Sequence, residues 1–301
     1  MTRRLRSCGF TLIEMIMVIV ILGVISGVLA VFMVSPVQGY FDAVRRAELV
    51  DTADTALRRI GRDLRRAVPN SVRVNAACAA ASCYLEFLPT TNGGRYRAAG
   101  ENTAQCAAAA TTLYDTLYFT PDTDSCFEIL GPPITFTTGD QIIIANFGNP
   151  GSNAFEGNTL STHVRRPYAG ATGAQVSKVV MTTPAGTSLP LESDSKRFQV
   201  VAAAEQAVTY ACENIGTVAG DGQGRLTRYW HYGIASLQPT SFAGGNSALI
   251  AENVSACNIV YGTLAASNPY TKNGVVAIIL GITRSGETIN LYHEIHVDIM
   301  P

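Results

Sequence analysis

The feature that most constrains this chain is an apolar run from Phe10 to Val34, in which Glu14 is the only charged residue. At about 1.5 Å per residue this run forms roughly 37 Å of helix, enough to cross a bilayer. Three basic residues and no acidic one precede it, namely Arg3, Arg4 and Arg6. Because such a flank stays cytoplasmic, we expect a single-pass membrane protein with most of its chain on the other side.

The carboxylate of Glu14 needs a partner, since a charge within a membrane helix costs about 2.5–3.5 kcal/mol on insertion scales. Gly9 stands directly before the apolar run, whereas an ordinary secretory signal has its small-residue cleavage site behind a shorter apolar core. Cleavage after Gly9 would give Phe10 a free amine. Glu14 could then neutralise this amine within its own helix or in a neighbouring subunit.

The stretch GFTLIEMIMVIVILGVISGV resembles the class III signal of type IV pilins and type II secretion pseudopilins. In that family a prepilin peptidase cuts after the glycine and methylates the new N-terminal phenylalanine. The resemblance implies cleavage after Gly9, methylation of Phe10 and subunit docking through Glu14. Val31 departs from the pattern, because many major pilins carry a proline there and this chain has Pro36 instead. Any helix-melting step tied to that proline is therefore in doubt.

The same resemblance implies the partners and the location. The partners are the prepilin peptidase, other minor and major pilins or pseudopilins, an inner-membrane assembly platform and membrane lipid. The expected location is the bacterial inner membrane with a periplasmic C-terminal domain, followed by the pilus or pseudopilus. A net charge of −1 makes nucleic acid an unexpected partner.

A second helical segment is expected from Tyr40 to Val68, because apolar residues recur there at steps of three and four. This stripe comprises Val50, Ala53, Leu57, Ile60, Leu64 and Ala67. Pro69 followed by Asn70 is expected to stop the helix.

Five arginines crowd the end of this segment, namely Arg58, Arg59, Arg62, Arg65 and Arg66. Without interleaved aromatic residues, they favour a solvated helix face over a partner-binding or DNA-binding patch. Asp54 and Arg58, and likewise Arg59 and Asp63, are four residues apart and can form ion pairs on that face.

Beyond Asn70 the pattern favours β-structure, so we predict an α+β, pilin-like fold. The expected parts are a leader (1–9), a transmembrane helix (10–35), a helix extending into the periplasm (36–69) and a β-rich globular domain with disulfides (70–301). Strands are predicted in CYLEFLP, TLYDTLYF, QIIIANF, SKVVMTT, RFQVVA, AVTYAC and RLTRYWHY. A hairpin is predicted with its turn at Arg284-Ser285-Gly286, and SALIAENV is interpreted as a short helix.

The sequence has seven cysteines, which limits the disulfides that can form. If Cys8 leaves with the leader, six remain, with no CxxC or nearby histidine pair to suggest zinc. They allow fifteen disulfide connectivities, with free buried thiols as the alternative. Of these we predict sequential pairing as Cys78–Cys83, Cys106–Cys126 and Cys212–Cys257.

Catalytic motifs are missing from the sequence, so we predict that the protein is not an enzyme. His293 and His296 lie three apart in a predicted strand and point to opposite faces, which disfavours a shared metal. PDTDSC and GDGQGR have residues suited to calcium, which related pseudopilins use, but both fall short of a calcium motif and favour plain turns. No cofactor is therefore expected.

Two further stretches narrow the family resemblance. ALRRIGRDLRRAVPNSVRV resembles the helix end of the large minor subunits, both the J-type pseudopilin of type II secretion and a subunit of the mannose-sensitive haemagglutinin pilus. GRLTRYWHY and LYHEIHVDIMP are more similar to the pilus subunit. The resemblance implies a minor pilin at the tip or in the initiation complex. The alternatives are a J-type pseudopilin and a surface-binding adhesin module.

Overall fold

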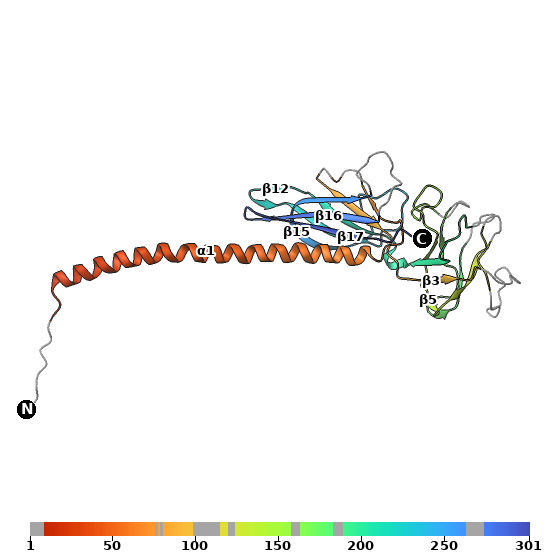
Figure 1. Ribbon diagram of the computed structural model, residues 1–301, viewed down its shortest axis with the longest axis horizontal. Helices are drawn as coiled ribbons and strands as arrows, with labels where there is room; N and C mark the ends of the chain where they lie inside the picture. The colour runs from red at the N-terminus through yellow and green to blue at the C-terminus, as the bar shows by residue number, and fades with distance from the viewer. Residues whose placement is uncertain are drawn as a thin grey trace, which may run out of the picture. The chain divides into compact units, whose positions relative to one another are not determined.

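The computed structural model describes residues 9–75, 78, 81–98, 115–119, 124–157, 163–182, 189–262 and 274–301. The chain divides into two compact units, Met1–Leu49 and Val50–Pro301. Helix α1, Leu12–Leu64, has 53 residues and contributes to both units (Figure 1). The last turns of the helix therefore belong with the β-rich unit rather than standing apart from it.

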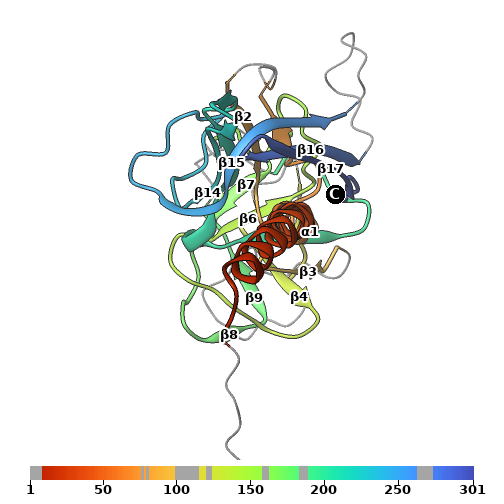
Figure 2. The same ribbon diagram turned by 90° about the vertical axis from the view of Figure 1, so that its left-hand side faces the viewer.

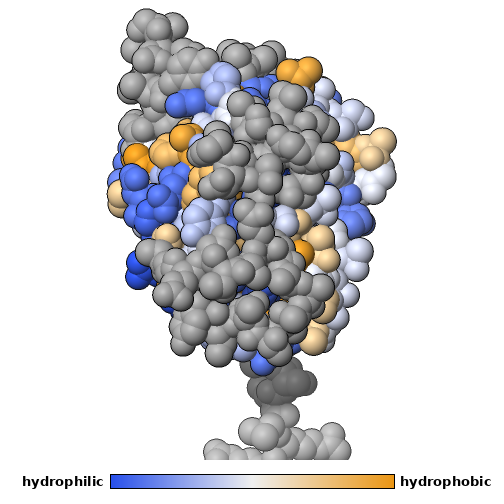
Figure 3. Space-filling view, turned by 90° about the vertical axis from the view of Figure 1, so that its right-hand side faces the viewer, coloured by the Kyte–Doolittle hydropathy of each residue, from blue (hydrophilic) through white to orange (hydrophobic). Residues whose placement is uncertain are grey.

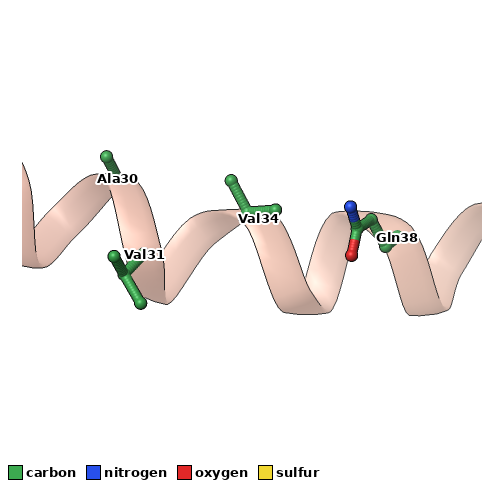
Figure 4. A pocket seen from close by; sticks show the side chains of 4 residues that line it. All are labelled: Ala30, Val31, Val34 and Gln38. Carbon is green, nitrogen blue, oxygen red and sulfur yellow. The ribbon is translucent and has the colours of Figure 1, made fainter.

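The N-terminal part of α1 exposes its apolar side chains, from Leu12 to Val34 and beyond. Among the described residues, one helix is long and apolar enough to cross a membrane. The helix continues unbroken past Val31, as Figure 4 shows, and includes Pro36. Pro36 has no N–H, so the carbonyl of Phe32 lacks its helical hydrogen bond. This single N-terminal helix is typical of the membrane anchor of pilins.

The C-terminal part of α1 buries one stripe, formed by Ala53, Ala56, Leu57, Ile60 and Leu64. The predicted stripe is wrong at its start, because Val50 is exposed and Leu49 is buried. The helix also ends at Leu64, before the predicted boundary at 69. It ends early because Ala67 bridges Pro89 and the Val68 N–H donates to the Leu88 carbonyl at 2.8 Å.

A seven-stranded antiparallel sheet covers the buried stripe of α1, in the order β1-β2-β11-β14-β15-β16-β17. Its strands are β1 Arg73–Val74, β2 Cys83–Phe87, β11 Val208–Glu213, β14 Gly224–Trp230, β15 Asn246–Tyr261, β16 Val275–Arg284 and β17 Glu287–His296. Under Gly61 the helix comes close to β17, with the side chains of His293 and Ile295 next to it. The edge strand β17 thus lies directly beside the helix.

A second sheet has six strands in the order β7-β6-β10-β3-β4-β9 and lies within the chain between β2 and β11. Its strands are β3 Asn92–Tyr96, β4 Cys126–Leu130, β6 Gln141–Ile144, β7 Arg165–Pro167, β9 Lys178–Val180 and β10 Arg197–Val201. Shorter elements are β5 Ile134–Thr135 with β8 Gln175–Val176, β12 Thr217–Val218 with β13 Asp221–Gly222, and the 3-10 helix η1 Ala203–Glu205. In Figure 2, β14 to β17 occupy the upper part of the view and β3, β4 and β9 the lower part.

The two sheets meet where α1 ends. Apolar residues from the helix exit, β6 and β10 form a shared core there, including Val68, Ile143 and Val201. Two buried amides reinforce it: Asn70 donates to the Asn146 carbonyl at 2.9 Å, and Asn146 donates to the Pro69 carbonyl at 2.6 Å. Asn70 adopts a φ of 59°, which asparagine tolerates better than most residues. The Pro69-Asn70 segment beyond the helix therefore helps to orient the second sheet.

Most strand predictions are confirmed, and the exceptions are instructive. The C-terminal hairpin forms with Ser285 and Gly286 at φ values of 53° and 79°, as a two-residue turn requires. The short helix in SALIAENV is wrong, because these residues extend within β15 and pair with β14. The predicted strand in TLYDTLYF is also wrong over residues 115–119, which are irregular.

Two of the three predicted disulfides are present, Cys78–Cys83 and Cys212–Cys257. Cys83 and Cys212 are register partners in β2 and β11, so the two bridges lie next to each other. Cys126 is also disulfide-bonded. Cys106, its predicted partner, lies outside the described residues.

Gly61→Ala is expected to stabilise the protein by about 1 kcal/mol, because glycine costs that much relative to alanine within a helix. A Cβ at Gly61 would lie 3.6 Å from Ile295 and 3.7 Å from His293, ordinary contact distances. Thermal unfolding of the full chain in detergent, followed by circular dichroism, measures the effect. Gly222→Ala is the contrasting control, since its Cβ would lie 2.0 Å from the Asn253 carbonyl oxygen. A loss of stability in Gly61→Ala would contradict the packing described.

Candidate assembly site

The N-terminus of α1 is closed by a reciprocal pair of hydrogen bonds between Thr11 and Glu14. Glu14 Oε2 accepts from the Thr11 backbone N–H at 3.0 Å and from Thr11 Oγ1 at 3.1 Å. The Glu14 backbone N–H donates to Thr11 Oγ1 at 3.4 Å. This is a capping box, and the spacing Thr-x-x-Glu is its sequence signature. Thr11 is thus a hydrogen-bond partner of Glu14 that the sequence analysis missed, although the Thr-x-x-Glu spacing indicates it.

The predicted cleavage point between Gly9 and Phe10 is exposed to solvent. Gly9 is exposed and Phe10 is 80% exposed, and both precede the first turn of α1. The predicted partner of Glu14, a free amine on Phe10, would exist only after cleavage. In the intact chain the carboxylate is held instead by the cap.

At its other end, α1 is fastened to the β-rich unit by a buried charge cluster. Arg228 Nε on β14 lies 2.9 Å from Asp63 Oδ2, and Arg228 Nη2 binds Glu205 of η1. The Tyr210 hydroxyl on β11 donates to the same Asp63 oxygen at 2.8 Å. Because Arg228 is 9% exposed, these partners compensate a charge that has little water around it. The cluster joins the helix, the first sheet and the link from the second sheet.

The electrostatics of this cluster favour the charged form of Arg228 and the neutral form of Tyr210. Burial works to lower the pKa of Arg228, but its hydrogen bonds to Glu205 and Asp63 outweigh burial and raise it. Burial raises the pKa of the Tyr210 hydroxyl, and the negative charge of Asp63 raises it further. Arg228 therefore stays protonated and Tyr210 stays a donor at any physiological pH.

The arginine-rich face of α1 is solvated, as the sequence predicts. All five arginines from Arg58 to Arg66 are exposed. Arg58 pairs with Asp54 at 2.6 Å. The predicted pair between Arg59 and Asp63 is not what forms, because Asp63 turns toward the sheet and binds Arg228. Spacing along the helix could not reveal this competitor on β14.

The remaining residues considered for chemistry do not converge in the described part of the chain. His293 faces Gly61 of α1, while His296 is exposed on the edge strand. No group of three His, Cys, Asp or Glu side chains suited to a metal ion occurs among the described residues. In GDGQGR, Asp221 accepts from the Ser285 backbone N–H at 2.6 Å and thereby holds the hairpin turn. Part of PDTDSC lies outside the described residues, and the absence of a cofactor stays a prediction.

Residues 4–30 match a family model described as the prokaryotic N-terminal methylation motif. The match supports a type IV pilin-like protein. It implies processing by a prepilin peptidase and assembly with other pilins, and it is typical of structural proteins rather than enzymes. Comparisons with curated proteins and with solved structures found no match. From residue 9 onward, the matched segment comprises the capped start of α1 and part of its exposed apolar stretch.

Asp63→Ala is expected to destabilise the full chain by about 1.5–3 kcal/mol, the range for hydrogen bonds to charged groups, because Arg228 and Tyr210 each lose a buried partner. Asp54→Ala is the matched control on the same helix. Its loss should be about 0.3–0.5 kcal/mol, since the Asp54–Arg58 pair is solvated. Urea unfolding of both variants in detergent measures the difference. Equal losses in the two variants would show that the buried cluster does not fasten the helix.

Proposed function

We propose that this protein is a minor pilin of a type IV pilus, similar to the MshO protein of the mannose-sensitive haemagglutinin pilus. The observation that carries the proposal is the methylation motif at residues 4–30, placed on a capped, exposed apolar helix. The similarity of residues 56–74 and 224–232 to the large minor subunits supports the finer assignment. The proposed role is structural, without catalysis, cofactor or nucleic acid.

The proposed sequence of events follows from the residues at the helix start. The arginines of the leader keep it in the cytoplasm, and α1 anchors the chain in the inner membrane. The prepilin peptidase cuts after Gly9 and methylates Phe10. Glu14 then binds the new amine of a neighbouring subunit as the assembly platform moves the protein into the fibre. The Thr11 cap holds the carboxylate in place until that amine is presented.

The size of the β-rich unit supports a place at the tip or in the initiation complex. Val50–Pro301 carries two sheets, of seven and six strands, where a single sheet could cover the helix. We infer that the second sheet hinders further subunits from stacking above it. Immunogold labelling along the whole pilus shaft would contradict this placement.

Two alternatives remain distinct from this proposal. A J-type pseudopilin would use the same helix start in a secretion machine. An adhesin would need exposed ligand-binding groups, and two of the three aromatics of RLTRYWHY have partners within the fold: Tyr229 stacks on Phe242 at 4.3 Å and Tyr232 donates to Glu86. Figure 3 shows hydrophobic residues singly or in small groups among hydrophilic ones at the end that bears the second sheet. These observations favour the pilin over the adhesin.

Deletion of the gene in its own host separates the two machines. The pilus assignment predicts loss of surface pili, seen by electron microscopy, with secretion of enzymes unchanged. Complementation with the intact gene is the control. Normal pili with blocked secretion would assign the protein to the secretion machine instead.

Glu14→Gln tests whether the charge of Glu14 matters beyond the cap. Glutamine can accept the capping hydrogen bonds from Thr11 but cannot neutralise an amine. We expect normal leader cleavage, measured by immunoblot, and about tenfold less protein in sheared pili, whereas Asp54→Asn should assemble normally. Full assembly of Glu14→Gln would show that only the cap is needed.

A further inference from the structure

A polar groove of about 450 Å³ lies where the last turns of α1 meet β17. It is lined by Asp54, Arg58, Gly61, Arg62, Arg65 and His293. Asp54 is paired with Arg58, so its charge is compensated within the groove. Arg62 and Arg65 are exposed, and neither has an ion-pair partner within the described ranges. The groove therefore carries three guanidinium groups against one carboxylate and is suited to an acidic ligand.

The strand beside this groove has a free edge. All ten residues of β17 pair with β16, and among the described residues β17 ends the sheet. Arg284 and Glu287 flank the two-residue turn, so they form a hydrogen-bonded pair and alternate residues direct their backbone groups away from β16. By this alternation the outward residues are Thr288, Asn290, Tyr292, Glu294 and His296. An edge of this length that no described strand covers is a template for another strand.

We propose that the edge of β17 and the arginine groove together bind an extended acidic segment of another protein chain as an added β-strand. Backbone pairing with β17 would supply affinity, and side chains at alternate positions would supply specificity. On the helix side of the added strand, every second residue meets Arg62 or Arg65 and is best a carboxylate. On the opposite face the neighbours are Tyr292 and Glu294, which favour hydroxyl or apolar residues.

Charge complementarity selects this occupant. A basic or neutral strand could pair with β17, but it would leave Arg62 and Arg65 without counter-charges. A flexible anion could meet the arginines, but it would leave the backbone edge unused. Only an acidic extended segment satisfies both features. The proposal holds whether the protein serves a pilus or a secretion machine, because it rests only on the groove and on the edge of β17.

The test uses the full chain in detergent and a fluorescent ten-residue peptide of alternating glutamate and threonine, with binding measured by anisotropy. We expect binding that weakens about tenfold in the double variant Arg62→Glu/Arg65→Glu. The matched control, Arg59→Glu/Arg225→Glu, makes the same change in net charge at exposed arginines outside the groove and should bind as the unaltered protein does. Binding that falls equally in both variants would overturn the proposal.

Two further probes separate strand addition from simple anion binding. The same peptide with alternate backbone nitrogens methylated keeps its charge but cannot pair, so it should fail to bind. Hydrogen exchange should slow at the outward amides of β17, such as Tyr292 and Glu294, when the unmethylated peptide is bound. No binding of the acidic peptide, or equal binding of the methylated peptide or of an oligothymidylate of equal charge, would overturn the proposal.

Discussion

The ion pair between Arg228 and Asp63 determines how the β-rich unit is held on its helix. A buried guanidinium is tolerated only when its donors are matched, and here the matches come from α1 through Asp63 and from η1 through Glu205. The 3-10 helix η1 follows β10 and precedes β11, so it belongs to the link between the two sheets. Arg228 of β14 therefore binds both α1 and this link. The apolar stripe of α1 supplies most of the buried side chains of the helix. Apolar contacts are not directional, so they do not by themselves fix the position of the helix along the sheet. The charge cluster fixes the register of the helix against the sheet.

The second sheet depends on the same junction. Its strands lie between β2 and β11 in sequence, so the chain must leave the first sheet beside the helix exit and return there. Asn70 and Asn146 exchange hydrogen bonds with backbone carbonyls at this point, while Val68 and Val201 share one core. The C-terminal segment is also held, because Asn70 donates to the Ile299 carbonyl at 2.8 Å. These contacts therefore help to set the position of the second sheet.

The carboxylates near the two ends of α1, Glu14 and Asp63, differ in the partners that the fold gives them. Asp63 is partly buried and is matched by fixed partners from the fold. Glu14 lies in the apolar segment and has only the local cap of Thr11, which satisfies hydrogen bonds but does not neutralise charge. A carboxylate held in this way stays available to a cation from outside the chain. This contrast gives the proposed docking role of Glu14 its physical basis.

The sequence by itself determined the features that depend on neighbouring residues. These include the apolar helix with its single carboxylate, the C-terminal hairpin, a helix end before Pro69 and the Cys78–Cys83 disulfide, whose sequence separation is 5. Local signals suffice for them, because periodicity, turn chemistry and short cysteine spacings act over a few residues. The hydrogen-bonded cap on Glu14 is also indicated by the spacing of Thr11 and Glu14.

Tertiary structure decided everything that depends on distant partners. Asp63 binds Arg228 rather than Arg59, and SALIAENV becomes a strand because β14 pairs with that part of β15. Glycine-rich NGGRY forms β3 because β10 pairs with it, and a side chain at Gly93 would meet the Phe198 carbonyl at 2.8 Å. No local pattern encodes those contacts, since each is fixed by the packing of segments far apart in the chain.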